Sequence, residues 1–175
     1  MKKILWAAAA FLSLAGAPAM AVDGIAVEVG NGDSTDMGRV AIQWDWNKRF
    51  YQGADWNVGG YWDLGLGYWQ NNGFPGRNKS LTEIGLTPVF RFQRNGLEGP
   101  YAELGLGAHL QSETTIGDKS MSTAFQFGSH LGLGYRFGVK RAFDLSYRYQ
   151  HLSNAGIHKP NDGINFNQVR LQYHF

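Results

Sequence analysis

Two residues near the C-terminal end of the chain, His151 and Ser153, have the types and the spacing that nucleophilic ester chemistry requires. They are two positions apart in a stretch of alternating apolar and polar residues. On a β-strand such positions share one face, with Cα atoms about 6.6 Å apart. A serine hydroxyl is a weak nucleophile until a base takes its proton, and an imidazole at this distance can do so. The same spacing also fits polar residues at the entrance to a loop, so both interpretations stay open.

The alternation predicts the strands that would position this pair. We expect strands at about 23–30, 38–46, 57–69, 80–92, 99–110, 123–137, 142–152 and 165–175. Several exceed the five or six residues typical of soluble strands and reach the 9–11 residues of tilted membrane strands. Their polar faces are rich in glycine, which suits a crowded barrel interior. Aromatic residues at strand ends, among them Trp44, Trp69 and Tyr173, are expected to lie at the membrane interfaces. We therefore predict an all-β fold, an eight-stranded antiparallel transmembrane β-barrel.

The first residues predict export. Lys2 and Lys3 precede an apolar run, and Ala19-Met20-Ala21 has the small residues of a cleavage site. We predict a cleaved signal peptide over residues 1–21 and one outer-membrane barrel over residues 22–175. The cationic residues are not clustered, which argues against a nucleic-acid partner. No histidines have metal-ligand spacing and the chain has no cysteine, so we expect neither a metal site nor a cofactor.

The parity of the last two strands predicts where the polar pair lies. With both termini in the periplasm, the strand at 142–152 runs outward. Phe143, Leu145, Tyr147 and Tyr149 then face lipid, as do His151 and Ser153 at its outer end. The same count turns Asn165 outward on the next strand. Polar side chains facing lipid are costly and call for an explanation, which a catalytic pair or polar residues at headgroup level could each provide. The other strand histidines are expected in the lumen: His109, His130 and His174.

Two segments at this end resemble a known family signature. They are His151–Gly156 (HLSNAG) and Lys159–Ile164 (KPNDGI), with weaker similarity at Trp44–Trp46 and Gly60–Asp63. They resemble the PagL family of lipid A 3-O-deacylases. This resemblance implies an outer-membrane barrel that hydrolyses the ester of the acyl chain at position 3 of lipid A. Lipid A, or the lipopolysaccharide that carries it, would be the substrate, and outer-membrane lipids would surround the enzyme.

The resemblance also implies residue roles. It makes Ser153 the nucleophile and His151 its base, with backbone N–H groups at Asn154 and Gly156 as the oxyanion hole. In the family a glutamate 14 residues after the histidine orients it, but this chain has Asn165 there. Either Asn165 orients His151 through its side-chain carbonyl, or Asp162 supplies a carboxylate. We favour Asn165, because parity places it beside His151.

Two other functions compete with deacylation of lipid A. One is an outer-membrane phospholipase that uses the same Ser-His-Asn chemistry. The other is a non-catalytic barrel with a structural or adhesive role, in which Ser153→Ala would change nothing. A homodimer is compatible with each of these functions.

Overall fold

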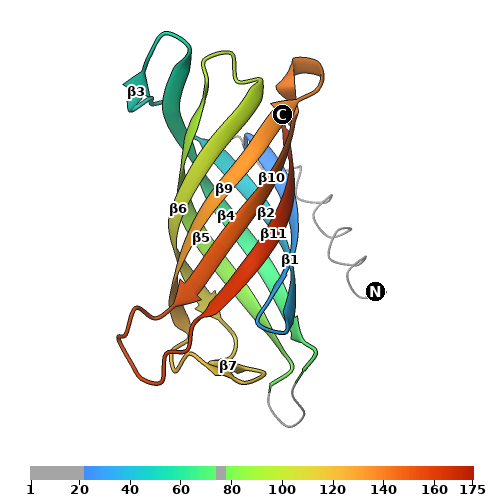
Figure 1. The fold of residues 1–175 in the computed structure, drawn as a ribbon, viewed down its shortest axis with the longest axis vertical. Helices are drawn as coiled ribbons and strands as arrows, with labels where there is room; N and C mark the ends of the chain where they lie inside the picture. The colour runs from blue at the N-terminus through green and yellow to red at the C-terminus, as the bar shows by residue number, and fades with distance from the viewer. Residues whose placement is uncertain (1–21, 74–77) are drawn as a thin grey trace.

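Eight long antiparallel strands close into a barrel in the computed structural model, which describes residues 22–73 and 78–175 (Figure 1). The strands are β1 (Gly24–Gly32), β2 (Thr35–Asp45), β4 (Trp56–Asn71), β5 (Ser80–Arg94), β6 (Gly99–Gln111), β9 (Phe125–Phe137), β10 (Phe143–Ser153) and β11 (Ile164–His174). β1 pairs with β11, and β2 pairs with both β1 and β4, so the sheet has no free edge. The predicted all-β barrel is confirmed. The predicted signal peptide, residues 1–21, lies outside the described residues.

Short elements decorate the two ends of the barrel. β3 (Tyr51–Gln52) adds to the start of β4, and β7 (Thr115–Ile116) pairs with β8 (Lys119–Ser120) in a small hairpin. A single 3-10 turn, η2 (Val139–Arg141), connects β9 to β10. Across the described ranges 22–73 and 78–175, no helix has the length and apolar character needed to cross a bilayer. Two longer connections, at 112–124 and 154–163, leave the end opposite the C-terminus, where β4 also ends and β5 begins, and we place this end outside the cell.

Side chains alternate between the two faces as predicted. On β4, Trp62, Leu66 and Tyr68 are exposed on the outer wall, whereas Tyr61 and Asp63 are buried in the lumen. One prediction is wrong: Trp69 does not lie at a membrane interface. It is 1% exposed and points inward, where its ring meets Phe166 with centroids 4.8 Å apart.

The middle of the lumen is filled by paired charges. Glu28 forms ion pairs with Arg39, Arg148 and Arg170, all of them buried. The other buried acids are paired similarly: Asp63, Glu83, Glu103 and Asp144. Burying a charge is tolerated only when partners compensate for the lost hydration. The lumen histidines His109, His130 and His174 are also buried, as parity predicted. The lumen is therefore a filled plug at this level.

The outer end of the lumen is apolar. A buried cluster gathers the inward side chains of five strands and two residues of the 112–124 connection: Met37, Trp69, Leu81, Ile116, Met121, Leu152, Ile164 and Phe166. Ile116 and Met121 are fully buried, and each such side chain contributes roughly 1.5–3 kcal/mol by leaving water. The β7–β8 hairpin is thereby held against the outer end of the barrel, where it is bonded to the loop that follows β10.

Candidate active site

The register of the last hairpin places His151 opposite Asn165. The two residues are Cα partners in the β10–β11 ladder, and both side chains are half-buried on the outer wall. His151 Nδ1 lies 2.8 Å from Asn165 Oδ1. An amide oxygen only accepts hydrogen bonds, so Nδ1 carries the proton and Nε2 keeps its lone pair. This is the tautomer that a general base needs.

Ser153 is the last residue of β10 and lies on the same face as His151. It is also half-buried, and its Cα partner on β9 is Phe127. In the described part of the chain, no hydrogen bond joins its hydroxyl to His151. Such bonds are often long without substrate and tighten when it binds. The structure therefore places the two predicted residues on one face, with His151 already oriented by Asn165.

A residue that the sequence analysis missed completes this polar group. Ser129 on β9 is the Cα partner of His151 on the side opposite Asn165, and it is half-buried. Its neighbours on the same face are apolar: Phe127 and Leu131 are 46% and 65% exposed. Counting by two from Phe127 to Leu131 would have identified Ser129, because a lone hydroxyl interrupts an apolar lipid face there.

The loop after β10 is held by the side chain of Asn154. Asn154 is fully buried, and its Nδ2 donates to Met121 O at 2.7 Å and to His158 O at 2.8 Å. Its own N–H donates to Asn161 Oδ1 at 3.0 Å, and the N–H of Gly156 donates to Asn154 Oδ1 at 2.9 Å. An oxyanion at either predicted donor would have to displace a side-chain oxygen.

Asp162, the alternative partner for His151, is engaged elsewhere. Its Oδ2 accepts from the N–H of Ser120 at 2.7 Å, and its own N–H donates to Ser120 O at 3.1 Å. This reciprocal pair ties the 154–163 loop to β8. Of the two candidates, Asn165 is the one in contact with His151.

Gly163 leaves room for the imidazole. It has φ +64°, and a Cβ there would lie 2.9 Å from His151 Cε1 and 3.2 Å from Leu152 O. Both the left-handed backbone and the close approach favour glycine. A side chain at position 163 would push against the ring that Asn165 orients.

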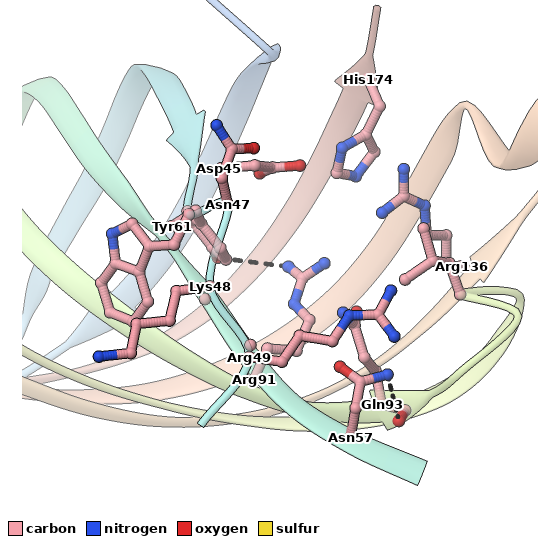
Figure 2. Close-up of a pocket in the computed structure, with 14 residues that line it drawn as sticks. Asp45, Asn47, Lys48, Arg49, Asn57, Tyr61, Arg91, Gln93, Arg136 and His174 are labelled. Atoms are coloured by element: carbon pink, nitrogen blue, oxygen red, sulfur yellow. Dashed lines mark hydrogen bonds between the residues drawn. The ribbon is translucent and has the colours of Figure 1, made fainter. Parts of the chain in front are cut away.

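A separate polar cavity lies at the opposite end of the barrel. It has a volume of about 210 Å³, and the ionisable residues around it include Asp45, Arg49, Arg91, Arg136 and His174. Figure 2 shows these side chains around the inner mouth of the lumen, with Arg91 bonded to Tyr61. None of its lining residues belongs to the His151 group. The barrel thus carries its lumen opening and its candidate active site at different ends and on different faces.

Comparisons with known proteins agree with this arrangement. A family model described as lipid A 3-O-deacylase (PagL) matches residues 36–174. The lipid A deacylase PagL of Pseudomonas aeruginosa is 34% identical over 166 residues, covering 94% of both chains. That of Bordetella bronchiseptica is 34% identical over 165 residues, covering 87% of this chain and 83% of its own length.

Solved structures give the same result. The crystal structure of the outer membrane enzyme PagL matches with a TM-score of 0.78 and 28% identity, covering 87% of this chain and 99% of its own. Neisserial surface protein A, with a TM-score of 0.52 and 15% identity over 87% of this chain and 94% of its own, shares the fold alone.

Proposed function

The chain belongs to the lipid A 3-O-deacylase (PagL) family, and we propose that Ser153, His151 and Asn165 carry its reaction. It is an outer-membrane barrel that hydrolyses the 3-O-linked acyl ester of lipid A. The observation that supports the residue assignment is the bond between His151 Nδ1 and Asn165 Oδ1 on the outer wall. All three residues come from one chain, so the chemistry requires no homodimer.

The position of this group suits a lipid substrate. His151, Ser153 and Asn165 lie at the outer ends of β10 and β11, on the face that also carries the exposed Phe127 and Leu131. A lipid A molecule in the outer leaflet reaches this face by lateral diffusion. Its acyl chains would pack on the apolar wall. Its ester would then lie beside the polar side chains that interrupt this wall.

Acyl transfer would begin with His151 Nε2 taking the proton of Ser153. The serine oxygen attacks the ester carbonyl and forms a tetrahedral intermediate, and the imidazolium then gives its proton to the departing 3-hydroxyl of the sugar. Water, deprotonated by His151, hydrolyses the acyl-enzyme and regenerates Ser153. Asn165 holds the ring in the required tautomer throughout, as an asparagine does in Cys-His-Asn hydrolases.

The oxyanion would be stabilised by backbone donors that follow Ser153. Asn154 and Gly156 are the predicted donors, although their N–H groups donate to side-chain oxygens in this structure. Ala155 lies between them with φ +54°, and among the described residues its N–H has no acceptor. We propose that the N–H of Ala155 belongs to the oxyanion hole, with Asn154 or Gly156 joining it when substrate binds. One such donor typically contributes about 2.7–4 kcal/mol to transition-state stabilisation.

Mass spectrometry of lipid A tests this proposal. Cells that express the protein should produce lipid A lacking one 3-linked acyl chain, and cells that express Ser153→Ala or His151→Ala should not. Ser146→Ala is the matched control, because Ser146 lies on the same strand but faces the lumen. Deacylation by both site variants would contradict the residue assignment. Release of lysophospholipid in place of deacylated lipid A would show a phospholipase.

A further inference from the structure

The first outer turn of the barrel contacts the active site from the other end of the sequence. β1 pairs with β11 because the barrel closes, so the β1–β2 turn at Asp33 and Ser34 lies against the start of β11. The approach is close: a Cβ at Gly32 would overlap the carbonyl oxygen of Asn165. The glycine allows the turn to reach the residue that orients His151.

Asp33 uses this approach to bind Asn165 directly. Its Oδ2 accepts a hydrogen bond from the backbone N–H of Asn165 at 2.9 Å, and its Oδ1 lies 3.5 Å from Lys119 Nζ. The Asp33 side chain is 27% exposed, so water screens it only in part. Lys119 thus contacts the Asp33 carboxylate, Asp33 contacts the backbone N–H of Asn165, and the Asn165 side chain contacts His151.

The backbone of the turn adds a second, independent observation. Asp33 and Ser34 have φ +49° and +57°. Two-residue hairpin turns of this type favour asparagine or aspartate followed by glycine, because both positions need a positive φ. Serine at the second position is therefore strained, and such strain often occurs at functional sites. The left-handed conformation of Asp33 belongs to the turn that presents its carboxylate to β11.

We propose that Asp33 supplies, through Asn165, the negative charge that the orienting residue of this enzyme does not itself carry. The proposal rests on the assignment of His151 as the base. An imidazolium forms in the transition state, and the amide of Asn165 stabilises it less than a carboxylate would. The Asp33 carboxylate is fixed on the backbone N–H of Asn165, and its negative charge stabilises the imidazolium across that one residue, at a site that is only partly exposed to water. Asp33 is thus a positioning residue that acts through Asn165.

The other groups around His151 do not offer such a charge. Its strand neighbours are Asn165 and Ser129, and Gly163 lies close to the Cε1 edge of the ring. In the adjoining loop, Asp162 bonds to Ser120, and the remaining titratable groups are the exposed His158 and Lys159. Asp36, on the same hairpin as Asp33, accepts a bond from Asn72.

The test compares Asp33→Asn with Asp36→Asn in the purified full-length barrel, acting on lipid A over a range of pH. Asparagine tolerates the left-handed conformation and keeps an oxygen for the N–H of Asn165, so the variant removes only the charge. We expect kcat/KM to fall roughly fivefold to tenfold for Asp33→Asn and to change less than about twofold for Asp36→Asn. We also expect the acid limb of the Asp33→Asn profile to move to lower pH, because an imidazole without the nearby carboxylate binds its proton less tightly.

A double variant tests whether the effect of Asp33 comes from its charge. In an Asn165→Glu background the orienting residue carries its own charge, so adding Asp33→Asn should lower kcat/KM less than about twofold. An Asp33→Asn enzyme with the rate and pH profile of the parent would overturn the proposal. So would a rate loss with an unshifted acid limb, which shows a structural role alone. Ser153→Ala is assayed in parallel: if it stays active, the proposed function fails, whatever Asp33 does.

Discussion

The lumen and the outer wall of this barrel hold their polar groups in opposite ways. In the lumen, Glu28 contacts three arginines, and each carboxylate of the buried layer has at least one cationic or imidazole partner. On the wall, His151 has one neutral partner, and Ser153 lies on the same face of β10 without a hydrogen bond to it in the described part of the chain. The lumen charges are buried and held by partners of opposite sign, whereas the half-buried pair on the wall keeps a lone pair and a hydroxyl available. We therefore expect the stability of the barrel to depend on the lumen and its catalysis to depend on the outer wall.

Removing the base from the wall should have the largest effect on chemistry and almost none on folding. We expect His151→Ala to lower kcat/KM for lipid A by about 10³-fold or more, as the loss of a triad member does in serine hydrolases. The folded barrel should persist, because His151 is half-exposed and outside the lumen network. Deacylation kinetics measure the first effect, and thermal unfolding in detergent measures the second. A marked fall in the unfolding temperature of His151→Ala would contradict the separation of stability in the lumen from catalysis on the wall.

Breaking the lumen should give the reverse result. Glu28→Gln leaves Arg39, Arg148 and Arg170 without the carboxylate that they share. Removing one partner of a buried ion pair typically costs about 3–5 kcal/mol. We expect a clear fall in the urea midpoint of unfolding, with kcat of the folded fraction within about twofold of the parent. Glu113→Gln, in an outer loop, is the matched control and should leave the midpoint unchanged.

The orienting residue should show an intermediate effect on the wall. Asn165→Ala removes the acceptor of the His151 Nδ1–H bond. We expect kcat to fall about 10–100-fold, less than the ~10⁴-fold cost of losing the buried aspartate of a serine protease triad, because an amide contributes less than a carboxylate. Asn165→Asp, which keeps an acceptor oxygen at the same position and adds a negative charge, should keep at least the rate of the parent. Full activity of Asn165→Ala would show that Asn165 has no part in the mechanism.

Much of the site could be predicted because a barrel has a strict period of two. Counting along β10 and β11 was enough to place His151, Ser153 and Asn165 on one outer face, and the order of the strands along the chain made β10 and β11 antiparallel neighbours. The wrong placement of Trp69 came from judging an aromatic residue by its position at a strand end. The parity of β4, read through Tyr68, would have turned Trp69 inward.

The contacts that the sequence did not predict depend on the closure of the barrel and on its loops. Asp33 lies 132 residues before Asn165, and only the β1–β11 pairing brings them together. The strands β1 and β2 also run farther than expected, so their connection is a two-residue turn in place of a longer loop. The bonds of Asp162 to Ser120 join a loop to a two-residue strand, and neither segment is long enough or regular enough to have a periodicity that indicates its partner.

The smallest expected effect comes from Lys119, and it tests whether His151 responds to the charges of Asp33 and its partner. Lys119 lies 3.5 Å from Asp33 and offsets part of its negative charge. We expect Lys119→Gln to move the acid limb of kcat/KM to higher pH, opposite in sign to Asp33→Asn, because the imidazole then faces a less compensated carboxylate. The change in rate should be about twofold or less and should shrink at high salt, since both side chains are partly exposed. Lys79→Gln, in another outer loop, serves as the control for net charge. If the acid limb moves in the same direction in Lys119→Gln and Asp33→Asn, these residues act on His151 by changing its position and not by their charge.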